Sequence, residues 1–333
     1  MRWLPFLFFF VSLSASAAAQ SSTGGDFSGG HEAFHPEAKV PTGAILVKGA
    51  WASANDALTP VPEGQSMVHN VFRDPYFGIA YSLPKNWVEQ FEGPPPSDTG
   101  HYVLAQLEYP GTTSNSIGGT ILITAQDMFF TPAPAQNALQ LVNYDKEHLE
   151  PDYKLELSPT RTTIAGRSFV FYAYWSPVAK LHWYVLTTEI RCHAVEFVMM
   201  SRDTKVLESL VLGMKAMQLP AEAGLTAGNG GRDFPVCIAD YAYSKNLQTR
   251  VDPIFRERSY NPVPVRIIID KNGSVKHIHF LSALPSQARA ISDALKQWKF
   301  KPYVGVHGAA EVETGLMFGR ALSPAQTGTS SVE

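Results

Sequence analysis

The chain has 333 residues, of which 45% are hydrophobic and 11% aromatic, and its formal net charge is −3. This composition is sufficient for packed hydrophobic cores, and the length favours about two domains. The small net charge argues against nucleic acid or an anionic membrane surface as the main partner.

The N-terminal residues 1–19 have the pattern of a secretion signal. Arg2 supplies the positive charge, Trp3–Leu13 form the apolar core, and Ala17–Ala19 form a small-residue cleavage site before Gln20. The apolar core is short of the roughly 20 residues that span a bilayer, so we expect cleavage rather than anchoring. No later stretch is long and apolar enough for a span, so no integral membrane segment is expected after cleavage.

Residues 20–66 are rich in Gly, Ser, Ala and Pro, which predicts an irregular leader. Its apolar patch GAILVKGAW, at Gly43–Trp51, is compatible with one docked strand. His31, Glu32 and His35 could contact a metal ion, but solvated polar residues are the simpler interpretation of this segment.

Residues 67–219 predict one α+β domain, in which helices pack on an antiparallel sheet. Apolar residues at helical spacing predict the helices Ala135–Leu149 and Thr204–Leu219. Strands are predicted where alternating or continuous apolar stretches lie between turns, at Tyr76–Trp87, Tyr102–Tyr109, Gly118–Met128, Thr162–Ser176 and Leu181–Ser201. The last of these stretches is long enough for two strands.

A Gly- and Ala-rich linker is predicted at 220–233, before a second domain at 234–320 and a disordered tail at 321–333. The second domain has the element order β-β-α-β. Its elements are the strand Val263–Asp270, the strand Ser274–Leu284, the helix Ser286–Trp298 and the strand Ala309–Gly319. A large aromatic residue at a helix end is normally buried, so we expect Trp298 to belong to the core.

The second domain resembles the C-terminal domain of TonB-family periplasmic proteins. The resemblance is carried by PVRIIIDKNGSVKHIHFLSALP, the helix ARAISDALKQWKFKP and the strand GAAEVETGLMF. These segments follow the family pattern of a strand, a D-x-x-G turn, a second strand, a helix, W-x-F/Y-x-P and a final strand. The matching residues are Asp270, Gly273, Val275, Ile278, Trp298, Phe300 and Pro302.

The resemblance implies a protein-binding module in the Gram-negative periplasm, because the family's domain pairs with short peptide segments of outer-membrane transporters. Such pairing uses the unpaired N–H and C=O groups of an open sheet edge. The expected partner is an envelope or outer-membrane protein. The edge strand expected to bind it consists of Glu311, Val312, Glu313, Thr314, Gly315, Leu316, Met317 and Phe318.

Two departures argue against a true TonB-type energy transducer. The N-terminal segment is short, lacks a histidine and ends in a cleavage site, whereas the transducers keep a membrane helix. A folded domain and a short linker replace their long Pro/Lys/Glu-rich spacer. The transducer, with an uncleaved anchor, is kept as an alternative.

The 67–219 domain resembles the PsbP-like α+β fold in its opening strand YFGIAYSLPKNW and in its order of strands and helices. This second resemblance implies a fold and no chemistry.

The mature chain contains two cysteines, Cys192 and Cys237. An exported compartment is oxidising and permits a disulfide between them. The alternative is two unpaired buried cysteines, and the sequence does not decide whether the two Cβ atoms meet.

No cofactor, metal or catalytic site is expected. His277 and His279 are two residues apart on one strand, and His307 could lie nearby, but exposed strand histidines are the simpler interpretation. An enzyme with its site in 67–219 is a third alternative, with unconnected candidate groups at His101, Asp145, Glu147, His148, His182, Glu189 and His193. The preferred prediction is an exported, non-enzymatic envelope protein, periplasmic or secreted, that binds protein partners by strand addition.

Overall fold

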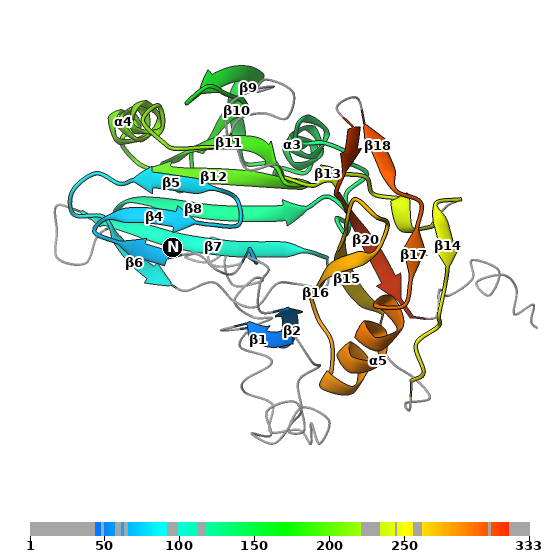
Figure 1. Ribbon diagram of the computed structural model, residues 1–333. Helices are drawn as coiled ribbons and strands as arrows, with labels where there is room; N and C mark the ends of the chain where they lie inside the picture. The colour runs from blue at the N-terminus through cyan, green and yellow to red at the C-terminus, as the bar shows by residue number, and fades with distance from the viewer. Residues whose placement is uncertain are drawn as a thin grey trace, which may run out of the picture.

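The computed structural model describes residues 44–47, 50–56, 61–62, 66–91, 99–111, 117–220, 234–243, 245–255, 262–305 and 308–319. The predicted signal at 1–19 and the predicted tail at 321–333 lie outside these residues. So do most of the leader and of the linker, together with His31, Glu32, His35 and His307. Figure 1 shows a broad sheet with its helices beside a smaller sheet that carries α5.

The broad sheet has seven strands in the order β6-β7-β8-β12-β11-β10-β9, and every neighbouring pair is antiparallel. The stretch Leu181–Ser201 is divided into β11 and β12 by a turn at Arg191–Cys192. The seven strands are β6 (Val88–Phe91), β7 (His101–Pro110), β8 (Ile117–Asp127), β9 (Lys154–Ile164), β10 (Arg167–Ser176), β11 (Leu181–Ile190) and β12 (His193–Ser201).

Both faces of the broad sheet are covered. One face packs against α4 (Thr204–Met214), and Phe197 and Leu207 belong to the same buried cluster there. A three-stranded sheet of β3 (Ser66–Val68), β4 (Val71–Asp74) and β5 (Ile79–Ser82) packs on the same core. The opposite face packs against α3 (Ala138–Glu147), where Leu141 meets Ala194.

Both helices of this unit begin at a side-chain cap. Asn137 Oδ1 accepts a hydrogen bond from the backbone N–H of Gln140 at 3.0 Å, and Asp203 Oδ1 accepts one from that of Lys205 at 2.9 Å. Each cap satisfies one of the backbone donors that the first turn of a helix leaves unpaired. The seven-stranded sheet with its two helices confirms the α+β class.

The smaller sheet has six strands in the order β1-β2-β16-β15-β20-β13. Its C-terminal members follow the order β-β-α-β along the chain: β15 (Val263–Ile269), β16 (Val275–Phe280), α5 (Pro285–Leu295) and β20 (Val312–Phe318). Two short pairs extend this unit, formed by β14 (Leu247–Thr249) with β17 (Lys299–Phe300) and by β18 (Tyr303–Gly305) with β19 (Gly308–Ala310).

The turn between β15 and β16 requires its glycine. Asp270 Oδ1 accepts hydrogen bonds from the N–H groups of Asn272 and Ser274, each at 2.8 Å. Gly273 has a φ of +80°, and a Cβ at this position would lie 2.0 Å from the carbonyl oxygen of Phe300. A side chain is therefore excluded both by the backbone conformation and by space.

Trp298 is 3% exposed and belongs to the core of this unit. Its indole N–H donates to the carbonyl of Val251 at 2.7 Å, and its ring lies 6.1 Å from the ring of Phe300 and 6.0 Å from that of Phe318. The aromatic residue at the end of α5 thus closes the core between the helix and the sheet, as a buried indole with a satisfied N–H should.

The leader contributes two strands to the smaller sheet, where the sequence suggested one. They are β1 (Ala44–Val47) and β2 (Ala50–Asp56), and β2 pairs with β16 at Asn55–His279 and Ala54–Phe280.

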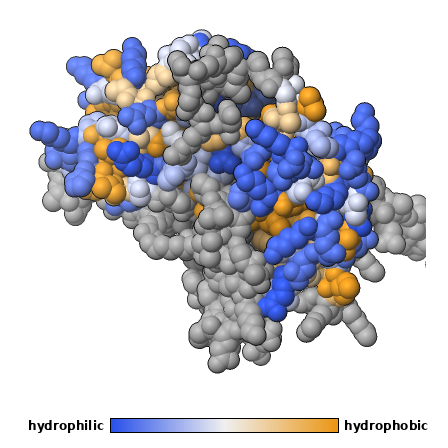
Figure 2. All heavy atoms as spheres, in the orientation of Figure 1, coloured by the Kyte–Doolittle hydropathy of each residue, from blue (hydrophilic) through white to orange (hydrophobic). Residues whose placement is uncertain are grey.

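The two units have separate hydrophobic cores. One core contains Phe72, Phe197 and Leu207, and the other contains Val265, Ile291 and Trp298. Over the part of the surface seen in Figure 2, described residues are mostly hydrophilic, with smaller apolar patches on both units. None of the helices in the described ranges combines the length and the apolarity that a membrane crossing needs.

Candidate functional site at the junction of the two sheets

The final strand β20 lies at the junction and has neighbours on both sides. It pairs antiparallel with β15 along its full length, from Val312–Ile269 to Phe318–Val263. On its other side the two-residue strand β13 (Val236–Cys237) pairs with it in parallel at Val312 and Glu313.

Glu311–Phe318 is therefore not the open edge expected from the sequence. The N–H of Val236 donates to the carbonyl of Glu311 at 2.8 Å, and the N–H of Ile238 donates to that of Glu313 at 3.1 Å. Five consecutive residues of β20, from Val312 to Leu316, are buried. The sequence showed the strand, but the segment that covers its edge lies far away in the chain.

Gly315 marks a close approach between the two units. A Cβ at this position would lie 2.7 Å from the Cβ of Phe129, which follows β8 of the broad sheet. Glycine inside a strand often marks such a contact, because another part of the protein approaches the backbone. The face of β20 is thus packed directly against the N-terminal unit.

A tight turn of the broad sheet reaches the same place. Arg191 and Cys192 connect β11 to β12 and have φ values of +48° and +62°. A two-residue hairpin loop favours positive φ at both positions, but glycine or asparagine usually occupies them. The positive φ of Arg191 and Cys192 costs free energy, so this conformation persists only where surrounding contacts stabilise it.

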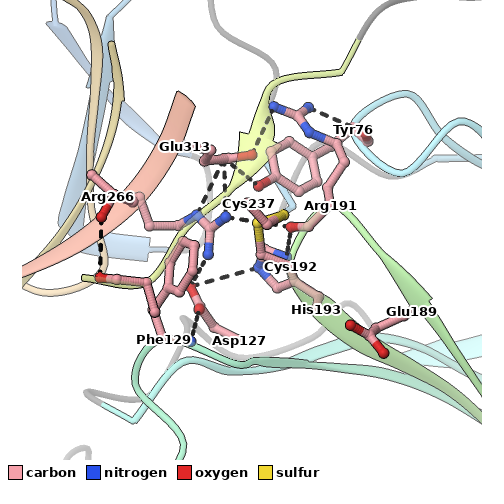
Figure 3. The surroundings of a disulfide bond; sticks show 12 residues. Tyr76, Asp127, Phe129, Glu189, Arg191, Cys192, His193, Cys237, Arg266 and Glu313 are labelled. Atoms are coloured by element: carbon pink, nitrogen blue, oxygen red, sulfur yellow. Dashed lines mark hydrogen bonds and ion pairs between the residues drawn. A yellow bond between two sulfur atoms is a disulfide. The ribbon is translucent and has the colours of Figure 1, made fainter. Parts of the chain in front are cut away.

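A disulfide between Cys192 and Cys237 provides one of these contacts. The two Cα atoms are 5.7 Å apart, within the usual range for a disulfide, and the cysteines are separated by 45 residues in the sequence. The sequence left the pairing open, and the structure contains the bond. It joins the turn of the broad sheet to β13 of the smaller sheet (Figure 3).

A cluster of buried charges lies beside the disulfide. Arg266 of β15 forms an ion pair and hydrogen bond with Asp127 through Nη1, and its Nη2 lies 3.0 Å from Glu313 Oε1. Arg191 Nη2 lies 3.6 Å from Glu313 Oε2, and the hydroxyl of Tyr76 donates to Glu313 Oε1 at 3.1 Å. In Figure 3 the guanidinium of Arg266 lies between the two carboxylates, one from each unit.

Aromatic rings complete the surroundings of the two guanidinium groups. Arg266 lies over the ring of Phe129 at 4.7 Å, and Arg191 lies over the ring of Tyr76 at 3.9 Å. Such contacts are favourable where the cation has been removed from water. The cluster contains two guanidinium groups and two carboxyl groups, and burial outweighs the charge of Arg266 and raises the pKa of Asp127 above its usual value.

The charges shift the pKa values within the cluster. Burial alone would raise the pKa of Glu313, but the positive charges of Arg266 and Arg191 outweigh burial and hold that pKa below its usual value. Burial alone would lower the pKa of Arg266, but the carboxylates of Asp127 and Glu313 hold it well above its usual value. Glu313 and Arg266 therefore stay charged.

His193 is a neutral member of the cluster. It is fully buried, and burial together with the charge of Arg266 holds its pKa well below the usual value. Its Nδ1 lies 2.7 Å from the carbonyl oxygen of Arg191, so this nitrogen carries the proton and donates it. Its Nε2 lies 3.7 Å from Asp127 Oδ2 and has no hydrogen-bond partner in the described part of the chain.

These groups join the two units and are buried. Asp127 and His193 are 0% exposed, and Arg266 and Glu313 are each 2% exposed. What the arrangement can do is fix the orientation of the broad sheet relative to β20, through opposite charges and one covalent bond.

The other candidate residues from the sequence are dispersed. His279 is 5% exposed, so the prediction of an exposed histidine is wrong at this position; its strand β16 lies inside the sheet, between β15 and β2. His277 is half-buried on the same strand. Within the described ranges, no group of three metal-ligating side chains comes together.

The candidate enzyme groups of the 67–219 domain are spread over different elements, with Asp145, Glu147 and His148 together at the end of α3. His182 pairs with Glu156 at 2.9 Å, and the ring of His148 lies 4.0 Å from that of Tyr144, tilted by 32°. Glu189 accepts a hydrogen bond from the N–H of Ala138 at the start of α3. Of these candidates, His193 reaches the buried charge cluster.

Sequence reasoning missed Tyr76, Asp127, Arg191 and Arg266. For Arg266 a signal was present, because it is the one charged residue in the apolar strand VPVRIII. A charged side chain in a strand that is buried throughout needs a buried partner of opposite charge. The sequence could not show that the partner Asp127 lies in another sheet, 139 residues away.

A groove of about 620 Å³ lies elsewhere, between α4 and the β9–β10 hairpin. Phe171, Tyr184 and Leu212 contribute apolar surface to it, and Glu156 and Glu208 contribute carboxylates. It contains none of the residues singled out from the sequence.

Comparison with known proteins finds no matching family model and no matching curated protein. Among solved structures, the chain is similar to the cyanobacterial PsbP protein CyanoP from Synechocystis sp. PCC 6803. The identity is 12%, the TM-score is 0.32, and the match covers 49% of this chain and 98% of that chain. It is also similar to LpqN of Mycobacterium tuberculosis, a protein involved in cell envelope biogenesis. There the identity is 16%, the TM-score is 0.32, and the match covers 50% of this chain and 91% of that chain. The TonB-like character of the C-terminal unit stays a prediction.

Proposed function

We propose that this chain is an exported, non-enzymatic protein of the cell envelope, periplasmic or secreted, that binds a protein partner at the outer edge of β20. The partner contributes an extended segment, which takes the place of β13 beside β20. The expected partner is an envelope or outer-membrane protein.

The observation that carries this proposal is the pairing between β20 and β13. It involves two residues of β13, it is parallel, and it uses the backbone carbonyls of Glu311 and Glu313 as acceptors. The outer edge of β20 thus has the geometry to hold an extended segment. An extended peptide of another protein presents the same backbone donors.

The junction supports a binding role in a second way. The ion pairs of Arg266 with Asp127 and Glu313 join both units beside β20. A rigid edge loses little conformational freedom when it binds, which favours affinity. The disulfide also supports an oxidising compartment.

Export is tested by expressing the full chain in a Gram-negative host. We expect a mature N-terminus at Gln20 in the soluble periplasmic fraction, with Cys192 and Cys237 oxidised. An intact Met1 in the inner membrane would support the energy transducer instead. Reduced cysteines in the cytoplasm would disprove export.

Binding at β20 is tested with a photoreactive amino acid at Met317, which is 45% exposed near the end of the strand. We expect irradiation of cells, either untreated or treated with a dithiol reductant, to cross-link this position to an envelope protein in at least one of the two conditions. A matched probe at Leu212 on α4, which is 63% exposed, should not give the same product. Identical products from both positions, or no product from Met317 in either condition, would contradict binding at this edge.

A further inference from the structure

The outer edge of β20 is covered by a segment of the chain itself. Besides the two backbone hydrogen bonds to Glu311 and Glu313, Thr314 Oγ1 donates to the carbonyl of Ala239 at 3.1 Å. The N–H of Met317 donates to the hydroxyl of Tyr243 at 2.8 Å. We call residues 236–239 the edge segment, because they lie where an added strand would lie.

The edge segment is held differently from the residues that follow it. Tyr241 and Ala242 are 5% and 2% exposed and belong to the core, and the hydroxyl of Tyr241 donates to the carbonyl of Lys301 at 2.6 Å. Val236 and Cys237 are both exposed. The edge segment is thus anchored by the core at its C-terminal end and by the disulfide near its N-terminal end.

The charge cluster does not depend on the edge segment. The ion pairs of Arg266 with Asp127 and with Glu313 use side chains of β8, β15 and β20. Release of β13 would leave these pairs in place, so the two units would stay joined while the edge opened. The disulfide is the covalent bond that holds the edge segment near the edge.

We propose that the edge segment is an internal occupant of the partner-binding edge, kept there by the Cys192–Cys237 disulfide, and that thiol–disulfide exchange releases it. This inference rests on the proposed function, because it describes the regulation of the same edge. The incoming partner is an extended peptide that pairs in parallel with β20 and carries an apolar residue at the position of Ile238, which packs against the core.

The exchange requires a dithiol reductant. Its thiolate attacks the sulfur of the exposed Cys237, a mixed disulfide forms, and Cys192 leaves as a thiolate that takes up a proton. The second thiol of the reductant then displaces Cys237. Two electrons pass to the protein, Cys192 and Cys237 become thiols, and the reductant becomes a disulfide.

The first test measures peptide binding to the mature full-length protein. The probe is a fluorescein-labelled peptide that copies residues 234–240 with Cys237→Ser, and a scrambled peptide is the control. We expect at least about tenfold tighter binding to the dithiol-reduced protein and to the Cys237→Ser protein than to the oxidised protein, because without the disulfide the edge segment is held only at its C-terminal end and competes less strongly with the probe. Equal affinity for the oxidised and reduced forms, or no binding to either, would overturn the proposal.

A proline pair tests the edge segment without changing the disulfide. Ile238→Pro removes the N–H that donates to Glu313, whereas Ala239→Pro leaves the donors of Val236 and Ile238 in place. In the oxidised protein, Ile238→Pro should bind the probe more tightly than Ala239→Pro does. Equal binding by the two variants would mean that the hydrogen bond to Glu313 does not hold the segment.

Hydrogen exchange separates release from unfolding. On reduction, the amides of Val236 and Ile238 should lose protection by a factor at least about tenfold larger than the amides of Val265 and Ile267 in β15, which report the change in global stability. An equal loss of protection at all four amides would show that the disulfide only stabilises the fold, and the proposal would fall. Cross-linking of a partner at Met317 in the oxidised protein would also disprove the control of this edge by the disulfide, but it would leave the proposed function standing.

Discussion

Replacement of Arg266 by methionine tests whether the buried charges hold the two units together. Arg266→Met keeps an unbranched apolar side chain but removes the cation between Asp127 and Glu313. Glu313 would keep Arg191 at 3.6 Å and the hydroxyl of Tyr76. Asp127 would keep the N–H of Phe129 at 2.8 Å and face a neutral His193. Asp127 is therefore the carboxylate left without a cation.

The expected loss follows from burial. Removing one partner of a buried ion pair costs about 3–5 kcal/mol, because the remaining charge is held away from water without compensation. Lys276→Met is the matched control on the neighbouring strand β16. Its pair with Glu311 is 2.8 Å long, but the two side chains are 44% and 24% exposed, so the expected loss is about 0–1 kcal/mol.

The measurement is urea unfolding of the oxidised proteins near neutral pH, followed by tryptophan fluorescence. Arg266→Met should lower the midpoint strongly, and Lys276→Met should barely change it. A change in the slope of the transition for Arg266→Met would show that the two units no longer unfold together. If Arg266→Met lost no more stability than Lys276→Met, the conclusion that these ion pairs hold the two units together would be refuted.

Three further predictions concern stability. Replacing both cysteines, Cys192→Ser with Cys237→Ser, should lower the free energy of unfolding by about 4 kcal/mol, from the loop closed by a sequence separation of 45; a loss below about 1 kcal/mol in urea would contradict this. Trp298→Ala should cost about 3–5 kcal/mol, because the side chain is buried and its N–H is bonded; calorimetry showing an unchanged melting temperature would place the residue outside the core. Burial and then the charge of Asp145 raise the pKa of Glu196 to about 7. Its contribution to stability is therefore present below its unfolded pKa of 4.5 and lost as pH rises through 7. Glu196→Gln should flatten the decline of the free energy of unfolding between pH 4.5 and about pH 7. The same pH dependence in this variant and the unchanged protein would count against the raised pKa of Glu196.

Local features of the fold could be predicted from the sequence. Asp270 and Gly273 indicated a turn, and in the structure the carboxylate of Asp270 caps that turn while Gly273 adopts a positive φ. Alternating apolar residues indicated the strands on either side. Such features depend on residues a few positions apart, so a short stretch of sequence is enough to specify them.

Trp298 was also predicted correctly as a core residue. Its large apolar surface favours burial in almost any compact arrangement, whatever its neighbours are. The sequence did not show that Val251 would accept its N–H, because that contact joins segments 47 residues apart.

The state of the β20 edge was decided by tertiary structure alone. Glu311–Phe318 has the pattern of a strand, but whether its outer side is open depends on where residues 236–243 lie. The same is true of Arg266, whose partners come from another sheet, and of Cys192, whose bond requires two backbones to meet. The sequence by itself determined the strands, the turn and the buried aromatic residue through local periodicity and hydrophobicity. The pairing of edges, charges and cysteines was decided only when distant segments packed together, because those interactions depend on distances that the order of residues does not encode locally.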